Sequence, residues 1–344
     1  MKIKKIAAPL TPAEIEIQKM RDKREGKEGI ISSLTARVLD LEKENATFKQ
    51  VGTMKPQNVE IKHKVSSGDS ESAAVVVWSD WHIEERVLPS QVSQKNEFNL
   101  AVADARFQRL LQGTLAWYQI ESAKTSIKTI VLALLGDFIT GSIHEDLAEG
   151  NQLPPAEAIH KAYSMIVSGI RFLLANTPKD VQFIVPCHSG NHGRMTKDQR
   201  IATEAGNSLE YFMYLMLRDY FASEKRLQFI VQSGYHSYVT FFDKFVIRFH
   251  HGHQINYQGG VGGITIPVNK AIAQWNKARP ANLDVFGHFH TKFDGGNFVC
   301  NGSLIGYNAY AVSIKASFEK PSQTFFLVNK KFMEKTMAAP IFLE

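Results

Sequence analysis

Histidine is scarce in this chain but gathers in two short stretches. Twelve histidines occur in 344 residues, and HHGHQI, residues 250 to 255, holds three of them within four positions. A second stretch, DVFGHFHT, sets His288 and His290 two residues apart after an apolar run. Imidazole is the commonest metal ligand among protein side chains. We therefore expect both stretches to serve one metal centre.

Further ligand types follow three apolar runs upstream of these histidines. SDWH provides Asp80 and His82, LGD provides Asp137, and SGNH provides Asn191 and His192. A single Asp or His after a strand is typical of a cap or another satisfied polar group. Five strand ends in succession with such residues, those of the two histidine stretches included, instead indicate one site at the edge of a layered sheet.

A pair of divalent cations fits these residue types. Two cations about 3.5–4 Å apart need a carboxylate that donates to both, and Asp137 is the natural bridge. Mixed nitrogen and oxygen ligands suit Mn, Fe or Zn better than Mg or Ca. In Asp-x-His and His-x-His, alternate side chains lie on the same side of an extended segment. Trp81 and Phe289 can therefore pack in the interior while their neighbours reach the metals.

Alternating strands and helices must position these ligands. Apolar, β-branched or aromatic runs predict strands at residues 73–80, 129–137, 181–187, 227–234, 237–243, 244–250 and 283–288, and two more at NFVCNGSLIG and QTFFLVNK. This alternation predicts a layered α/β architecture with reactive groups where strands end. One helical stripe is expected to face the core; it consists of Ile201, Ala205, Leu209, Phe212, Met216 and Tyr220.

The first 65 residues differ from the rest of the chain. They carry fourteen Lys or Arg and nine Asp or Glu, whereas the remainder is nearly neutral. Apolar residues follow a heptad spacing of 3, 4, 3, 4, 3 through Ile31, Leu34, Val38, Leu41, Asn45 and Phe48. A buried Asn45 would favour a two-stranded parallel pair, so this helical arm is expected to form a homodimer through residues 31–48 or else to pack on its own body.

Composition limits the remaining possibilities. SSGDSES, residues 66–72, is a polar linker, and residues 73–344 form the body. No apolar run approaches the eighteen or so residues of a membrane span, and the start has no stretch of signal-peptide length, so a cytoplasmic protein is expected. The two cysteines, Cys187 and Cys300, are far apart, which indicates neither a disulfide framework nor a thiolate metal site.

The order of motifs D-x-H, GD, GNH, a later H, and GHxH resembles that of the calcineurin-like metallophosphoesterases over about residues 73 to 305. The resemblance implies a sandwich of two mixed β-sheets flanked by helices, and hydrolysis of phosphoesters by a hydroxide that bridges two divalent metals. Manganese is the first expectation, with iron or zinc as alternatives. The implied ligands are Asp80, His82, Asp137 and His290 for one metal, and Asp137, Asn191, His251 and His288 for the other.

The same resemblance assigns roles around the metals. His192 would be the acid that protonates the leaving oxygen. In the fourth motif His251 is the expected ligand, His253 is the alternative, and His250 is expected to pack in the interior. The stretches GDFITGSIHED and GNHGR depart from the protein Ser/Thr phosphatases and from the repair exonucleases of the family, whereas longer stretches resemble phosphoesterases encoded by tailed bacteriophages. The host cytoplasm is then the expected location.

Substrate contacts are expected from a few further residues. Arg194 could clamp a phosphate in fork geometry, and His144 or Glu145 could line the mouth of the site. His253 is a further candidate for a substrate contact. The leading expectation is hydrolysis of phosphodiester bonds in nucleic acid, DNA before RNA, because of the basic arm. The alternative is a phosphatase or phosphodiesterase of a small nucleotide or a protein phosphoester, and a third is a binding subunit without turnover.

Overall fold

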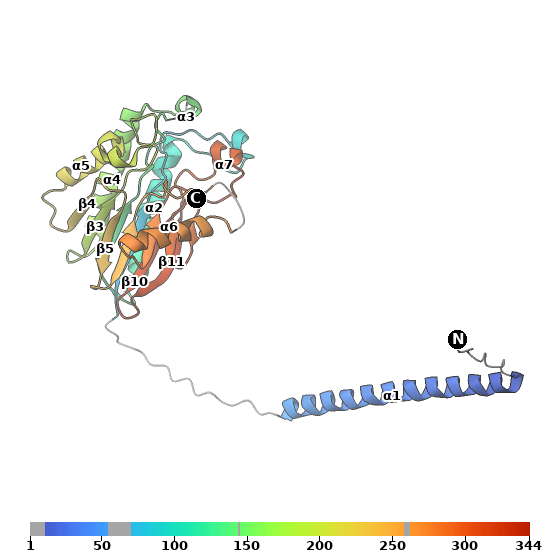
Figure 1. Ribbon diagram of the computed structural model, residues 1–344. Coiled ribbons are helices and arrows are strands. Elements are labelled where there is room, and N and C mark those ends of the chain that lie inside the picture. Colours follow the sequence, from blue (N-terminus) through green and yellow to red (C-terminus); the bar gives the residue numbers. More distant parts are fainter. Residues whose placement is uncertain (1–10, 54–69, 144, 258–261) are drawn as a thin grey trace, which may run out of the picture. The chain divides into compact units, whose positions relative to one another are not determined.

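The computed structural model describes residues 11–53, 70–143, 145–257 and 262–344 (Figure 1). The chain divides into two compact units, Met1–Ser67 and Gly68–Glu344. Among the described residues, no helix combines the length and the apolar character that a membrane crossing requires.

The first unit contains one long helix, α1 (Pro12–Thr53). Thr11 and Glu14 start it as a reciprocal capping pair, because the Glu14 carboxylate accepts from the Thr11 N–H at 2.7 Å and Thr11 Oγ1 accepts from the Glu14 N–H at 3.4 Å. The helix carries as many acidic as basic residues, eight of each, so the basic excess of the arm lies at sequence positions outside α1. In the single chain the heptad residues 31, 34, 38, 41 and 45 are exposed, and the side chain of residue 48 lies outside the described set.

The larger sheet of the second unit has the order β11-β10-β1-β2-β3-β4. Its parallel strands are β1 (Glu71–Trp78), β2 (Ser126–Leu134), β3 (Gln182–Cys187) and β4 (Leu227–Val231). Two antiparallel strands complete it at one side, β10 (Ser322–Asn329) against β1 and β11 (Glu334–Phe342) at the edge. Parallel order brings the carboxyl ends of β1, β2 and β3 to one edge of the sheet.

The smaller sheet has the order β5-β6-β7-β9-β8. It consists of β5 (Ser237–Phe241), β6 (Phe245–Phe249), β7 (Leu283–Phe286), β9 (Phe298–Cys300) and the two-residue β8 (Phe293–Asp294). The strands β6, β7 and β9 are parallel, and the outer strands β5 and β8 are antiparallel to their neighbours. Both sheets are therefore mixed.

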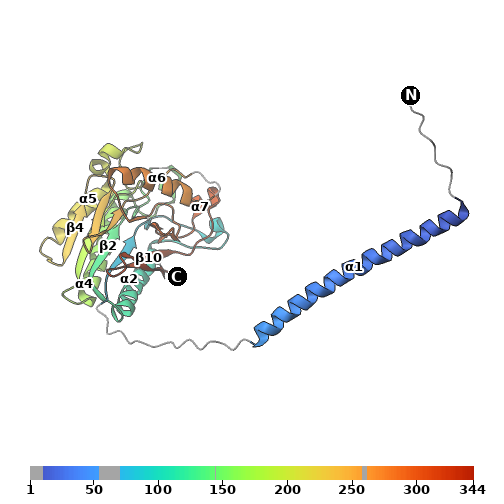
Figure 2. The ribbon, with the colours of Figure 1, turned by 60° about the horizontal axis from the view of Figure 1, so that its bottom comes forward.

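Helices cover the outer face of each sheet. The helices α2 (Leu100–Ser122), α4 (Pro155–Asn176) and α5 (Leu209–Tyr220) lie on the larger sheet, and α6 (Thr265–Ala278) lies on the smaller one. Figure 2 shows α6 and the pair α2 and α4 on opposite sides of the strands. The short helices are η1 (Pro89–Val92), α3 (Glu145–Gly150), η2 (Ile201–Thr203), η3 (Ala205–Asn207) and α7 (Ala309–Ser313).

Strand β1 shows why these layers form. Ala74, Val76 and Trp78 point to the helix-covered side of the larger sheet, whereas the alternate residues 73, 75 and 77 pack between the sheets against Phe249 and Val285. Every one of these side chains is buried, as expected for a central parallel strand covered on both faces. The predicted α/β sandwich of two mixed sheets flanked by helices, with an N-terminal helix, is confirmed.

The predicted core stripe through residues 201–220 is wrong. Ile201, Phe212, Met216 and Tyr220 are 37–59% exposed, and the helix begins only at Leu209. The face that packs inward instead carries Glu210, Met213, Tyr214 and Leu217. Apolar residues occupy both faces of α5, so spacing alone does not select one. The interior position of Glu210, whose hydrogen bonds are described below, fixes the rotation of the helix.

Candidate metal centre

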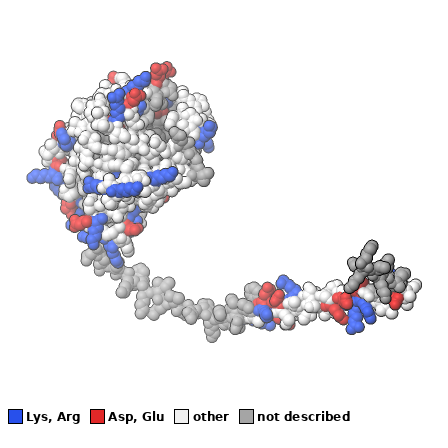
Figure 3. All heavy atoms as spheres, in the orientation of Figure 1, with Lys and Arg blue, Asp and Glu red and all other residues white. Residues whose placement is uncertain are grey.

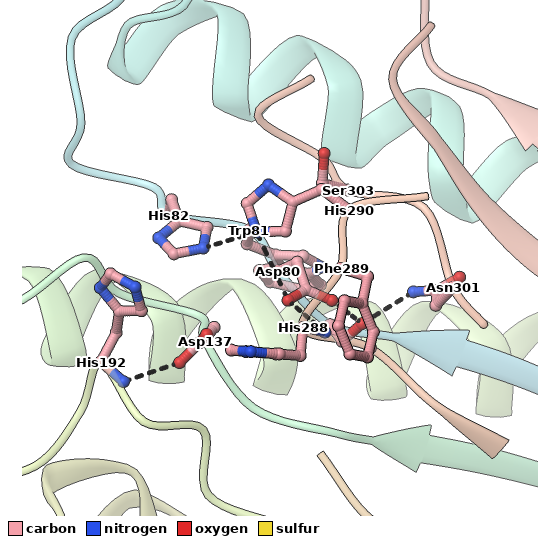
Figure 4. A network of polar contacts seen from close by, with 12 residues as sticks. Asp80, Trp81, His82, Asp137, His192, His288, Phe289, His290, Asn301 and Ser303 are labelled. Atoms are coloured by element: carbon pink, nitrogen blue, oxygen red, sulfur yellow. Dashed lines mark hydrogen bonds and ion pairs between the residues drawn. The ribbon is translucent and has the colours of Figure 1, made fainter. Parts of the chain in front are cut away.

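The expected ligands lie in loops that directly follow strands. Asp80 and His82 follow β1, Asp137 follows β2, and residues 191 and 192 follow β3, all at one edge of the larger sheet. His251 follows β6, and residues 288 and 290 follow β7, in the smaller sheet. Figure 4 shows the side chains from both sheets turned toward one another. The structure thus brings together residues that are up to 210 positions apart in the sequence.

Among the described residues, three overlapping groups of side chains could hold metal ions. Within each group the ligand atoms lie within 4.8 Å of one another. The groups are Asp80, His82 and His290; Asp137, His251 and His288; and His82, Asp137 and His192. Each of the first two groups contains three of the four ligands expected for one metal; the first lacks Asp137 and the second lacks Asn191. The third joins them, so the candidate sites are adjacent, and it adds His192 as a further ligand candidate.

Individual distances show how closely the atoms converge. The Nε2 atoms of His82 and His290 are 3.2 Å apart, and His290 Nε2 is 3.6 Å from Asp80 Oδ1. In the second group His251 Nε2 is 2.9 Å from Asp137 Oδ2 and 3.2 Å from Asn191 Oδ1. Both nitrogen and oxygen atoms therefore point at each candidate position, a mixture that suits Mn, Fe or Zn.

Most of these ligands have an unusual backbone conformation. Five non-glycine residues of the centre have φ between 49° and 69°; they are Asp80, His82, Asp137, His288 and His290. This left-handed region is uncommon for non-glycine residues and costs of order 1–3 kcal/mol each, so it persists only where neighbours enforce it. Bonds between loops do so here. The Asp137 carbonyl accepts the Trp81 N–H at 2.8 Å, and Asp80 Oδ1 accepts the His288 N–H at 2.9 Å.

Two glycines allow the loops after β2 and β3 to touch. Gly136 has φ of +87°, and a Cβ there would overlap the backbone of Gly190. A Cβ on Gly190 would overlap the Asp137 carboxylate in turn. The His192 N–H can then donate to Asp137 Oδ1 at 2.8 Å. The glycines that precede Asp137 and Asn191 in the motifs are thus required by close packing around the Asp137 carboxylate.

Hydrogen bonds to the inner ring nitrogens orient the imidazoles. His251 Nδ1 donates to the Leu135 carbonyl at 2.6 Å, and His192 Nδ1 donates to the Thr140 carbonyl at 2.9 Å. His82 Nδ1 lies 3.1 Å from Thr140 Oγ1. Each bond leaves the Nε2 atom of its ring facing the centre, which is the usual arrangement around metal-ligating histidines. Thr140 was not expected from the sequence, and it orients two rings.

Burial keeps several of the imidazoles neutral. Desolvation, with neighbouring histidines adding to it, holds the pKa values of His82 and His288 well below the ordinary value. Burial also lowers the pKa of His290, to about 4. A neutral ring is the form that binds a metal. These three side chains therefore need to lose no proton at neutral pH before coordination.

The two carboxylates and His251 differ from that pattern. Burial, together with the nearby Asp137 charge, raises the pKa of Asp80 to about 7. Burial would raise the pKa of Asp137 too, but His251, His192 and His82 outweigh it and hold that pKa well below its usual value. Burial opposes the protonation of His251, yet the Asp137 carboxylate raises its pKa to about 10. A metal at this position must displace the His251 proton.

Two buried glutamates that the motifs did not predict support the ligand loops. Glu210 accepts the N–H groups of Phe138 and Gly190 on its two oxygens, both at 2.7 Å, and so ties the loop after β2 to the loop after β3. Glu84 Oε1 accepts the N–H groups of Thr140 and Gly141, both at 2.8 Å. Burial raises the pKa of Glu210 to about 8 and that of Glu84 to about 7. The doubled acid directly after DWHI was the one sequence signal for Glu84.

The expected substrate contacts have different surroundings. Arg194 donates to the carbonyl of Asn191 at 2.6 Å, so its guanidinium holds the loop of an expected ligand. His253 is buried, and its Nε2 lies 3.1 Å from Glu204 Oε1. The centre of its ring lies 5.4 Å from the centre of the His251 ring. His250 stacks on Phe286, in keeping with packing. Residue 144 lies outside the described residues.

The chain has only distant similarity to known proteins. No protein-family model matches it, and no curated protein does. Among solved structures, a hypothetical protein from Pyrococcus horikoshii OT3 has 12% identity and a TM-score of 0.38 over 79% of this chain and 89% of that chain. A novel phosphatase from Mycoplasma pneumoniae has 12% identity and a TM-score of 0.28 over 79% of this chain and 92% of that chain. At such scores, the residues of the site are the better guide to function.

Proposed function

We propose that this protein is a phosphoesterase that uses two divalent metal ions to hydrolyse phosphodiester bonds. The observation that carries the proposal is the pair of ligand groups joined through His82 and Asp137. The donors fit such ions, because each group combines a buried carboxylate with at least one imidazole that burial keeps neutral. The proposed ligands are Asp80, His82, Asp137 and His290 for one ion, and Asp137, Asn191, His251 and His288 for the other.

The chain's own residues then have definite tasks. When bound, the two ions would neutralise charge on the phosphate oxygens and supply a nucleophilic water at neutral pH. Asp137, buried between the two groups, holds the two positions close together. His192 is only partly buried, and its Nδ1 donates to the Thr140 carbonyl, so the doubly protonated ring can give its second proton, on Nε2, to the leaving oxygen. Because His192 also belongs to a ligand group, an experiment must separate the two roles.

The metal is proposed to be manganese, with iron or zinc as alternatives. Four imidazoles, two carboxylates and one amide make up the proposed ligand set. This mixture lies between the all-oxygen sites of magnesium or calcium and the thiolate-rich sites of structural zinc. Neither cysteine belongs to a ligand group found among the described residues, so the proposed set contains no sulfur.

Nucleic acid, with DNA first and RNA second, is the proposed substrate. The segment 265–279, which contains α6, has three exposed cations, Lys270, Lys277 and Arg279, and no acid. Figure 3 shows a row of Lys and Arg atoms across the face of the body on which α6 lies in Figure 1. A row of cations without acids suits the phosphates of a polyanion. The near neutrality of the whole body favours the alternative, a small nucleotide or a protein phosphoester.

The arm is proposed to form a homodimer. Ile31, Leu34, Val38 and Leu41 are 43–61% exposed on a helix that otherwise carries balanced charges. Two such stripes could bury one another in a parallel coiled coil with Asn45 at the interface. A dimer would place two catalytic bodies on one molecule. We retain the third alternative, a binding subunit without turnover, only as an outcome of the assay below.

The test is hydrolysis by purified protein after metal removal and reconstitution with Mn²⁺. Bis-p-nitrophenyl phosphate reports phosphodiesterase activity, p-nitrophenyl phosphate reports phosphatase activity, and single-stranded and duplex DNA report nuclease activity. We expect turnover of the diester and of DNA that disappears with a chelator and returns with metal. Turnover of the monoester alone would support the alternative substrate class. No turnover of any substrate with metal bound would contradict the proposal.

A further inference from the structure

An apolar patch is exposed beside the metal centre. Within the segment 310–318, Tyr310 is 61% exposed, Val312 42%, Ile314 56% and Phe318 45%. We call these four side chains the rim patch. They come from α7 and the loop that follows it. Several large apolar side chains exposed within one short segment of a soluble protein indicate a candidate binding surface.

Hydrogen bonds anchor both ends of this segment to the loops of the metal centre. At one end Asn308 donates to Glu85 Oε1 at 2.9 Å, and Glu85 Oε2 accepts from Thr140 Oγ1 at 3.4 Å. Thr140 in turn contacts the ring of the proposed ligand His82. At the other end Glu319 accepts the N–H of Lys292, two residues beyond the proposed ligand His290, at 2.8 Å. The segment that carries the rim patch is therefore tied at both ends to loops of the metal centre, and its helix α7 is labelled in Figure 1.

Positive charge surrounds the patch. The segments that frame it are residues 86–97, 291–292 and 308–320, and their exposed cations are Arg86, Lys95, Lys292, Lys315 and Lys320. Of the acids in these segments, Glu97 is exposed, whereas Glu319 holds the Lys292 N–H. Lys95 Nζ lies 5.9 Å from the centre of the Phe318 ring. Exposed aromatic rings interleaved with lysines suit a ligand that has both flat apolar groups and phosphates.

We propose that the rim patch binds the unpaired bases of a single-stranded nucleic acid while the surrounding cations bind its phosphates. The inference rests on the proposed function and names the substrate form. A single strand fits better than a duplex, because only unstacked bases offer their faces to aromatic side chains. The anchors at Asn308 and Glu319 hold the patch close to the metals, so a strand bound there would lead into the site.

The test compares the full-length protein with three variants. Tyr310→Ala and Phe318→Ala each remove one ring of the patch. Phe332→Ala is the matched control, because Phe332 is 64% exposed and has Lys331 Nζ at 5.7 Å from its ring centre. It lies in the turn between β10 and β11, beside the start of β1 and thus at the opposite end of the sheet from the ligand loops.

Fluorescence anisotropy with a labelled oligo(dT), measured with Ca²⁺ in place of the catalytic metal, gives the dissociation constant for each protein. Loss of one stacking ring should raise the dissociation constant about 5- to 100-fold in Tyr310→Ala and in Phe318→Ala. The dissociation constant of Phe332→Ala should match that of the wild type. With Mn²⁺, both patch variants should lose more turnover of the oligonucleotide than of bis-p-nitrophenyl phosphate. Thermal unfolding midpoints equal to that of the wild type would show that the variants are folded.

The outcomes separate this inference from the proposed function. Equal oligonucleotide affinity in wild type and patch variants overturns the inference, even when the aryl diester is hydrolysed. Binding that depends on the patch, in a protein that hydrolyses no ester, supports the inference and contradicts the proposed function. Patch-dependent binding to anionic lipid vesicles, or a patch-dependent change in assembly state, without binding to oligo(dT), would show another occupant and overturn it.

Discussion

Replacing Glu84 by glutamine should remove a pH dependence of stability without breaking a hydrogen bond. Glu84 is fully buried, and its Oε1 accepts two backbone N–H groups at 2.8 Å. Its Oε2 has no hydrogen-bond partner among the described residues. The amide oxygen of glutamine can accept both N–H groups, and its NH₂ group takes the place of Oε2. The variant therefore resembles the protonated glutamic acid at every pH.

The magnitude follows from the raised pKa. Burial raises the pKa of Glu84 from 4.5 to about 7 in the folded protein. The stability that the protonated carboxyl contributes is fully present below pH 4.5 and is lost as the pH rises through 7. The difference between the two pKa values corresponds to on the order of 3 kcal/mol. The wild type should lose free energy of unfolding of that order over this range, and Glu84→Gln should not.

Urea unfolding of the metal-free protein, followed by the fluorescence of the buried Trp78 and Trp81, measures the effect. The free energy of unfolding of Glu84→Gln minus that of the wild type should rise by about 1–3 kcal/mol from pH 5 to pH 8. Glu157→Gln, at an exposed position in the first turn of α4, controls for the loss of one charge. The reasoning is refuted if the difference for Glu84→Gln is the same at both pH values.

Three further predictions concern the metals and the arm. Elemental analysis should find that His192→Ala keeps its metals, and the variant should hydrolyse esters with poor leaving groups about 10²–10⁴-fold more slowly than the wild type. Loss of metal from the variant would identify His192 as a ligand. In calorimetry, metal binding should release more protons at pH 6 than at pH 8. Asp80, whose pKa is about 7, loses a proton only at the lower pH, whereas His251, whose pKa is about 10, loses one at both. Equal proton release at the two pH values would contradict this prediction. Deletion of residues 1–67 should give a monomer by light scattering, and a truncated dimer would show that the arm is not the interface.

Much of the site could be predicted because its signals are local. Asp80, Asp137 and His288 each lie two positions beyond the last residue of an apolar run, and the parallel order of β1, β2 and β3 brings such positions to one edge of the sheet. Two facts about the loops could not be read from spacing. The left-handed backbone of five expected ligands and the contact between Gly136 and Gly190 depend on the packing of loops from separate strands.

The supporting residues were harder to predict because their partners are backbone groups. Glu210 lies in a helix with apolar residues on both faces, and only the N–H groups of Phe138 and Gly190 explain why a carboxylate packs inward. Strand β11 escaped prediction because it is an edge strand whose burial alternates weakly and which contains Pro340. Strand β8 has only two residues, both exposed.

Counting the metal ions in wild type and Asp137→Asn tests the central claim most directly. Asp137 is the buried carboxylate shared by two of the three ligand groups found among the described residues, and His82 links these two groups to the group of Asp80. A neutral amide cannot hold two cations together against their repulsion. Elemental analysis after reconstitution with Mn²⁺ should therefore find about two ions per wild-type chain and at most one in the variant, with hydrolysis of bis-p-nitrophenyl phosphate abolished. Two ions in Asp137→Asn with activity intact would contradict the two-metal site.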